Sequence, residues 1–214
     1  MLSGAAPEAQ ARQAMAALDR ELVDRDAGLV RLLDPPLAHG EPSAGYIQAD
    51  PPGVRENGGQ YAHAAVWALM AQALHGDIEG AWQTFEGLSP AHRARHPERG
   101  PLYEIEPYVM AGDVYSAAPY AGRGGWSWYT GSAAWLHRAA VETLLGLSVR
   151  GDQLALTPRV PAHWPGFEIA LRLAGKRFTL RFGEAGTAPA TQRAAIGEWV
   201  IWRIWPQDAI VQIG

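Results

Sequence analysis

Residues 122–147 have the sequence "GRGGWSWYTGSAAWLHRAAVETLLGL", and the character of the chain changes at the end of this stretch. From Thr130 the alanine- and leucine-rich run predicts a helix. Gly146 is a natural stop for that helix, because glycine adopts the left-handed conformation in which helices commonly end. After Gly146 the apolar residues alternate. The stretch therefore predicts a helical part over 1–146 and a β part over 147–214.

The part before this stretch has the apolar spacing of helices. Segments 7–23 and 58–77 carry apolar residues at helical intervals, and 77–88 begins with Asp77, a good N-cap. Pro107 at a first turn suggests a further short helix over 107–115. Three long Gly- and Pro-rich loops separate the helices, a length typical of functional loops: 33–60, 89–105 and 116–128. We therefore expect a mainly α fold with its binding face on the loops.

The part after Gly146 has the pattern of β-hairpins. Segment 147–156 alternates around Gly151-Asp152, and segment 167–182 alternates around a turn at Gly175-Lys176. These two hairpins predict a small antiparallel β-domain. The tail from Gly183 has no regular pattern, and its structure stays open.

Composition excludes several classes of protein. The net charge of −4 and the scattered basic residues do not suit nucleic acid, and no apolar run is long enough to span a membrane. The absence of cysteine and of a secretory signal at the start of the sequence leads us to expect a soluble, cytoplasmic chain, unless it is part of a larger membrane-bound protein. Nine Trp and seven Tyr suit the binding of sugar rings, although composition alone favours aromatic core packing.

Two predicted helix starts carry residues suited to an anion. In "PPGVRENGGQYAHAAVWA", residues 51–68, a glycine turn follows Arg55 and leads to His63 near the start of a helix. At the other start, Thr130, Gly131 and Ser132 supply hydroxyl and N–H donors behind an aromatic run. The same residues can also be explained without a ligand. Arg55 and Glu56 would then be a solvent-facing pair, His63 a core histidine, and the aromatic residues before Thr130 a seal between the helices and the sheet.

Other polar residues offer weaker signals. Glu104 and Glu106 lie two apart in a stretch expected to be extended, and with Asp113 nearby they allow the acid and base of a glycoside hydrolase. Either glutamate could equally hold a loop. His92 and His96 have a zinc-like spacing, but their loop is basic and lacks a matching acid, so we expect no metal site.

Together, "PPGVRENGGQYAHAAVWALMA", "YEIEPYVMAGDVYS" and "GRGGWSWYTGSAAWLHRAAVETLLGL" resemble the C-terminal part of the catalytic region of glycoside hydrolase family 94, the inverting glycoside phosphorylases. The resemblance covers about residues 10–182 and is closest to the cyclic β-1,2-glucan synthase and β-1,2-oligoglucan phosphorylase branch. It implies the C-terminal part of an (α/α)6 barrel followed by a small β-domain.

The resemblance also implies a reaction. In this family phosphate attacks the anomeric carbon with inversion and gives a sugar 1-phosphate, so inorganic phosphate is a co-substrate and no cofactor is needed. The resemblance implies that phosphate binds to His63, Thr130 and Gly131. The residues expected along a β-linked glucooligosaccharide are Arg55, Glu56, Trp126 and Trp128.

One motif of the family does not occur in this sequence. The general-acid Asp lies in a stretch resembling Asp-Trp-Asn-Asp, which is absent from these 214 residues. We therefore expect a C-terminal fragment that has no catalytic acid, is inactive alone, and pairs with a missing N-terminal half or as a homodimer. The alternatives are a non-catalytic carbohydrate-binding remnant and an inverting hydrolase that uses Glu104 and Glu106.

Overall fold

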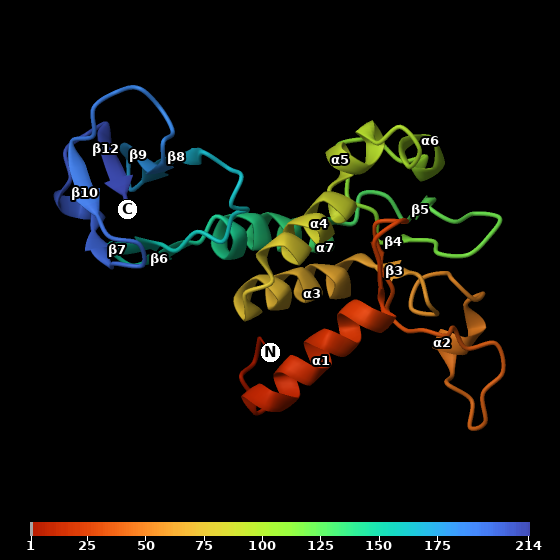
Figure 1. Cartoon of the computed structure of the whole chain (residues 1–214). Coiled ribbons are helices and arrows are strands. Elements are labelled where there is room, and N and C mark those ends of the chain that lie inside the picture. Colours follow the sequence, from red (N-terminus) through yellow and green to blue (C-terminus); the bar gives the residue numbers. More distant parts are fainter. Residues whose placement is uncertain (1) are drawn as a thin grey trace. The chain divides into compact units, whose positions relative to one another are not determined.

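The computed structural model describes residues 2–214, and the chain divides into two compact units, Met1–Ala140 and Val141–Gly214, called unit 1 and unit 2 below (Figure 1). Unit 1 is built mainly of helices, with two small sheets. Unit 2 is built mainly of strands. No helix within residues 2–214 has both the length and the apolar character required to cross a bilayer.

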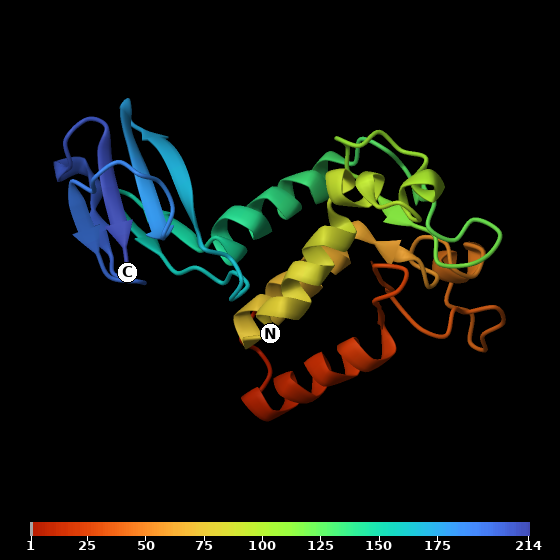
Figure 2. The ribbon, with the colours of Figure 1, turned by 45° about the horizontal axis from the view of Figure 1, so that its top comes forward.

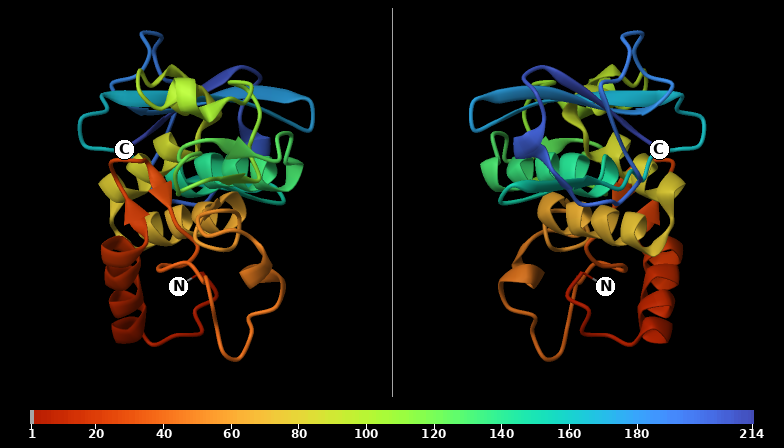
Figure 3. Two further views of the ribbon diagram at one scale, coloured as in Figure 1. Left: turned by 90° about the vertical axis from the view of Figure 1, so that its right-hand side faces the viewer. Right: turned by 90° about the vertical axis from the view of Figure 1, so that its left-hand side faces the viewer.

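In unit 1, α3 lies beside α4 and α7 (Figures 1 and 2), and the segment around α2 projects away from them (Figures 1 and 3). The helices are α1 (Glu8–Glu21), α2 (Tyr46–Ala49), α3 (Ala62–His75), α4 (Ile78–Leu88), α5 (Pro90–Arg95), α6 (Gly100–Tyr103) and α7 (Thr130–Arg138). The strands are β1 (Val23–Asp24) with β2 (Leu29–Val30), and β3 (Gln60–Tyr61), β4 (Asp113–Val114) and β5 (Gly124–Gly125). The predicted long loops thus contain short elements.

The junction between α3 and α4 confirms the predicted helix signals. Gly76 ends α3 with a left-handed φ of 96°, a conformation that costs glycine little. The Asp77 side chain then accepts the N–H of Gly80 at 3.0 Å and caps α4. Val66 and Leu69 of α3 are fully buried. Burial of this helix face, more than intrinsic propensity, holds the pair together.

The predicted helix over 107–115 is wrong. Asp113 and Val114 instead form β4, which pairs antiparallel with Gln60-Tyr61 on one side and Gly124-Gly125 on the other. Val114 is buried in the small core of this region. Long-range pairing therefore overrides the local helix signal of Pro107.

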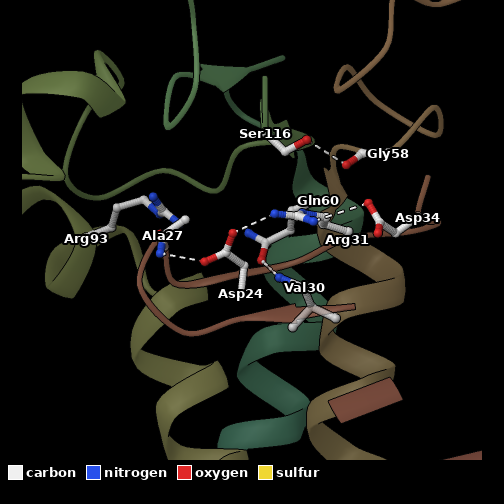
Figure 4. A network of polar contacts seen from close by, with 9 residues as sticks. All are labelled: Asp24, Ala27, Val30, Arg31, Asp34, Gly58, Gln60, Arg93 and Ser116. Atoms are coloured by element: carbon white, nitrogen blue, oxygen red, sulfur yellow. Dashed lines mark hydrogen bonds and ion pairs between the residues drawn. The ribbon is translucent and has the colours of Figure 1, made fainter. Parts of the chain in front are cut away.

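Buried polar contacts fix the short β1–β2 hairpin to the rest of unit 1. The Gln60 side chain accepts the N–H of Val30 at 2.8 Å, and both residues are buried. Figure 4 shows this contact together with the Asp24–Arg31 ion pair and the Arg93 guanidinium near the hairpin turn. The contacts of Gln60 and Arg93 satisfy backbone groups that a two-residue strand leaves unpaired.

The predicted helix over 130–146 is present but irregular. It is α-helical over Thr130–Arg138 and continues as the π-helical segment η1, Ala139–Leu144. Gly146 follows with φ 77°, and an added Cβ there would lie 1.9 Å from the carbonyl oxygen of Thr157. Only glycine fits this stop.

Unit 2 contains both predicted hairpins. They are β6 (Leu147–Arg150) with β7 (Gln153–Leu156), and β8 (Gly166–Leu173) with β9 (Lys176–Gly183). The second turn is Ala174-Gly175, one residue earlier than expected, and both residues have positive φ. The alternating residues Phe167, Ile169, Leu171 and Leu173 pack against the core, as predicted.

The tail forms the centre of a sheet. It contains β10 (Gln192–Ala194), β11 (Val200–Ile201), η2 (Trp202–Ile204) and β12 (Ala209–Ile213). The strand order is β10-β12-β9-β8, and β12 runs parallel to both neighbours (Figure 1). The prediction of a small antiparallel domain therefore holds for the two hairpins, whereas the sheet that the tail completes is mixed. Val211 and Ile213 are almost fully buried. Parallel neighbours are not joined by a short turn, so the sequence carries no hairpin signal for β12. This explains why the structure of the tail could not be predicted.

Two isoleucines of the tail test this placement. Ile213→Ala should lower the free energy of unfolding of unit 2 by about 2–5 kcal/mol, because the residue is 2% exposed. The matched change Ile204→Ala, at a residue 77% exposed, should cost less than about 0.5 kcal/mol. Urea unfolding of the full chain, with hydrogen exchange at β9 and β12, measures both. Equal losses would contradict the central position of β12.

Candidate active site

One strand segment lies between the starts of α3 and α7. The N–H of Ala62, at the start of α3, donates to the carbonyl of Gly112 at 2.9 Å. The N–H of Tyr129, before α7, donates to the carbonyl of Met110 at 3.0 Å. Two helix starts that are far apart in sequence are thus held by neighbouring carbonyls of one segment.

The two predicted anion-binding positions meet at this place. A Cβ added to Gly131 would lie 2.9 Å from both Cε1 and Nε2 of His63, so the imidazole edge touches the glycine backbone. Tyr129 packs edge-on against the His63 ring, with centroids 5.4 Å apart. The Nδ1 atom of His63 is buried and has no hydrogen-bond partner among the described residues. The histidine is therefore held by packing, with Nε2 toward the start of α7.

The start of α7 has no side-chain cap. The hydroxyl of Ser132 donates to the carbonyl of Tyr129 at 2.9 Å, and no side chain accepts an N–H at the start of this helix. Thr130 and Gly131 are exposed. The first N–H groups of the helix and its positive dipole end are left for another acceptor.

Arg55 and Trp126 meet although they are far apart in sequence. The Arg55 guanidinium lies 4.6 Å from the ring centroid of Trp126, within the range of a cation–π contact. Both residues have positive φ, 49° and 56°, which is uncommon for bulky side chains. Such backbone strain is concentrated at functional sites. Glu56 lies next to Arg55 and is half-buried.

Trp128 and the two predicted glutamates have other partners. The indole N–H of Trp128 donates to Glu106 at 3.3 Å, and Tyr108 packs edge-on against the indole. Glu104 has a left-handed φ of 52° and forms an ion pair with Arg123 at 3.2 Å. The expectation of one extended stretch with both carboxylates on a face is therefore wrong. Trp126 and Trp128 are each 62% exposed, so part of each indole is accessible to a ligand.

Asp113 holds the loop that carries Arg55. Its Oδ2 accepts the N–H of Arg55 at 3.0 Å, while Oδ1 is buried without a partner in the described chain. Burial raises the pKa of this carboxyl, and the hydrogen bond from Arg55 lowers it by less. The sequence offered Asp113 only as one more carboxylate. Its position after Gly112, before a β-branched and an aromatic residue, was the signal for a strand.

Sequence reasoning missed Tyr61. Its hydroxyl oxygen lies 3.2 Å from that of Tyr129, and this hydrogen bond, with burial, raises the pKa of Tyr61 to about 12. The phenol of Tyr61 therefore stays neutral near pH 7. An aromatic residue directly before a histidine-bearing helix start was the available signal.

The two histidines with zinc-like spacing lie elsewhere. His92 Nδ1 lies 3.0 Å from the Ser89 hydroxyl, and His96 Nδ1 accepts the N–H of Arg99 at 3.2 Å. Within residues 2–214 no three His, Cys, Asp or Glu side chains gather in the manner of a metal site.

The class of protein is shown by comparison with known families. The family model of the glycosyl hydrolase 94 superfamily catalytic domain matches residues 1–146, and that of the glycosyl hydrolase family 65 C-terminal domain matches residues 147–188. The chain belongs to the glycosyl hydrolase 94 superfamily, as its sequence motifs suggested.

Similar proteins include a synthase and phosphorylases. The cyclic beta-(1,2)-glucan synthase NdvB of Rhizobium meliloti is 48% identical over 174 residues, which is 81% of this chain and 6% of the synthase. Solabiose phosphorylase of Paenibacillus borealis is 29% identical over 77% of the chain and 21% of its own length. N,N'-diacetylchitobiose phosphorylase of Vibrio proteolyticus is 27% identical over 85% of the chain and 22% of its own length. The chain thus spans less than a quarter of these relatives.

The raised pKa of Asp113 gives a pH-dependent stability. A carboxyl whose pKa is higher in the folded than in the unfolded chain stabilises the fold at low pH, and this stability is lost as pH rises through the folded pKa. Asparagine does not titrate, so the Asp113→Asn variant should not lose stability in this way as pH rises. The unfolding free energy of the variant minus that of the wild type should therefore rise with pH from about pH 4 upward. Urea unfolding across pH measures the difference. A difference that falls with pH would mean that the carboxylate is stabilised when charged.

Proposed function

We propose that unit 1 carries the phosphate side of an inverting glycoside phosphorylase site. In this proposal His63, Thr130 and Gly131 bind inorganic phosphate. The β-linked glucooligosaccharide lies against the exposed indoles and the cation beside them: Trp126, Trp128, Arg55 and Glu56. The product is a sugar 1-phosphate, and phosphate is the only co-substrate required.

The observation that carries the proposal is the contact between His63 and Gly131. It brings an imidazole to the uncapped start of α7, where free N–H groups and the helix dipole favour an anion. The start of α3 also lacks a side-chain cap. Phosphate bound here would be the nucleophile, so the site would need no carboxylate to activate water.

The general acid is not among the residues that we assign. In the family it lies on a stretch resembling Asp-Trp-Asn-Asp, which these 214 residues do not contain. We propose that the helices of unit 1 are part of an (α/α)6 barrel and that the acid is supplied from outside this sequence. The partner would be the remaining barrel helices or a second copy, and the chain alone would bind its ligands without turning them over.

Phosphate binding tests the cradle. His63→Ala should weaken phosphate binding by about tenfold or more, because a charge-assisted hydrogen bond contributes roughly 1.5–3 kcal/mol. Gly131→Ala should also weaken it, since the new methyl group would displace the His63 ring. His137→Ala, at an exposed histidine of α7, is the matched control and should bind as wild type. Calorimetry and thermal stabilisation by phosphate measure these effects. Unchanged binding in both site variants would refute the proposal.

Sugar binding tests the aromatic wall separately. Trp126→Ala should weaken binding of a β-linked glucooligosaccharide about tenfold, or ~1.4 kcal/mol, because the variant loses an exposed ring face. Trp199→Ala removes a partly exposed indole from unit 2 and should leave binding unchanged. Calorimetric titration of the full chain compares the two. Equal losses would point to a non-specific effect of removing tryptophan.

A further inference from the structure

A cavity of unit 1 that is separate from the site proposed above is lined by three arginines and two histidines. It has a volume of about 250 Å³ and lies where α4 meets α5, on the segment that carries the two histidines. Its charged and titratable lining residues are Glu86, His92, Arg93, Arg95, His96 and Arg99. None of these residues belongs to the site proposed above.

The arginines of this cavity are not neutralised by the protein. In the described part of the chain, no carboxylate oxygen lies within 4 Å of a side-chain nitrogen of Arg93, Arg95 or Arg99. Glu86 forms no such ion pair either, although it lines the same cavity. Elsewhere in unit 1 arginines commonly pair with acids, as Arg31 does with Asp24. An excess of positive charge therefore remains around the cavity.

Arg93 places one of these charges in the interior. It is 3% exposed, its Nε donates to the Gly87 carbonyl at 3.1 Å, and its Nη2 donates to the Gly28 carbonyl at 2.8 Å. Its Nη1 is buried and has no acceptor. Burial, with a smaller contribution from the charge of Arg99 and against an opposing one from Tyr103, lowers the pKa of Arg93 to about 10. A buried, incompletely paired cation is costly, and an adjacent anion would offset that cost.

The groups at the exposed side of the cavity are suited to contact the anion. Arg95 is exposed and has no partner among residues 2–214. Arg99 is held by the Asp26 carbonyl at 2.8 Å, while its Nε lacks an acceptor. His96 accepts the Arg99 N–H at Nδ1, so its ring proton lies on Nε2. Several donors around one space can bind the oxygens of a tetrahedral oxyanion.

We propose that this cavity binds a small phosphate-bearing anion, either inorganic phosphate or the phosphate group of a sugar phosphate. Arg95, Arg99 and the histidines would contact the oxygens, and Arg93 would add charge from behind the wall. A metal ion is disfavoured because three guanidinium groups surround the space. Nucleic acid is disfavoured by the overall charge of −4 and by the small volume. This site is additional to the one on His63.

The experiment uses the full chain with His63→Ala as background, so that phosphate binding at the first site is weakened about tenfold or more. Calorimetry with inorganic phosphate should still detect one binding event, and Arg95→Gln added to this background should weaken it about tenfold. Arg172→Gln removes an equal charge from an exposed position of unit 2 and should change nothing. Glucose 6-phosphate in a parallel titration decides the source of the phosphate group: tighter binding than inorganic phosphate assigns a sugar phosphate.

Two results would overturn this inference: no phosphate binding in the His63→Ala chain, or equal effects of Arg95→Gln and Arg172→Gln. Failure of the proposed function has a different signature. In that case wild-type chain would show a single binding event that Arg95→Gln weakens and His63→Ala leaves intact. Because Arg95 is exposed, we expect its substitution to leave the fold intact. Circular dichroism of each variant checks that the chain is folded.

Discussion

The arrangement of unit 1 depends on the backbone hydrogen bonds of segment 110–113. Its carbonyls accept the N–H groups that precede or begin α3 and α7, while the N–H of Gly112 donates to the carbonyls of Gly125 and Trp126 at 3.0 and 2.9 Å. A side chain at residue 112 would crowd this point, since an added Cβ would lie 3.0 Å from the Cβ of Trp126. One short segment thus sets the distance between two helix starts and fixes the aromatic loop beside them.

This constraint explains why the helix starts are chemically open. A helix that begins in a free loop is commonly capped by its own Ser, Thr or Asp, as Asp77 caps α4. At α3 and α7 the chain enters from the small sheet, and tyrosines occupy the capping positions. Unused N–H groups and left-handed residues then gather in one place. Left-handed φ values at Arg55 and Trp126 persist because the surrounding hydrogen bonds over-determine the loops.

The sequence predicted those parts whose structure is decided locally. Apolar spacing and Asp77 indicated the α3–α4 pair, and alternation around Gly151 indicated the first hairpin of unit 2. Strand β4 and strand β12 could not be predicted in this way, because each is defined by partners distant in sequence. For the site, helix-start chemistry and family resemblance selected His63 and Thr130. The role of Asp113 was hidden, since the N–H that it accepts belongs to a residue 58 positions away.

Asp113 shows how this unit trades stability for geometry. Burying a carboxylate with one unpartnered oxygen is unfavourable, and an apolar residue of similar volume would remove that cost. Such a residue could not accept the Arg55 N–H, and the turn over 53–58 would lose one of the bonds that hold it to β4 and the residues after it. The other bonds are those of Ser116, whose N–H and hydroxyl donate to the carbonyls of Gly53 and Gly58.

Because these contacts fix the backbone on both sides of Arg55, the guanidinium is directed to Trp126 before any ligand arrives. Binding at a preorganised cation–indole pair loses less conformational entropy than binding at a mobile loop. The carboxylate is therefore best understood as a positioning group whose cost in stability is offset at the site.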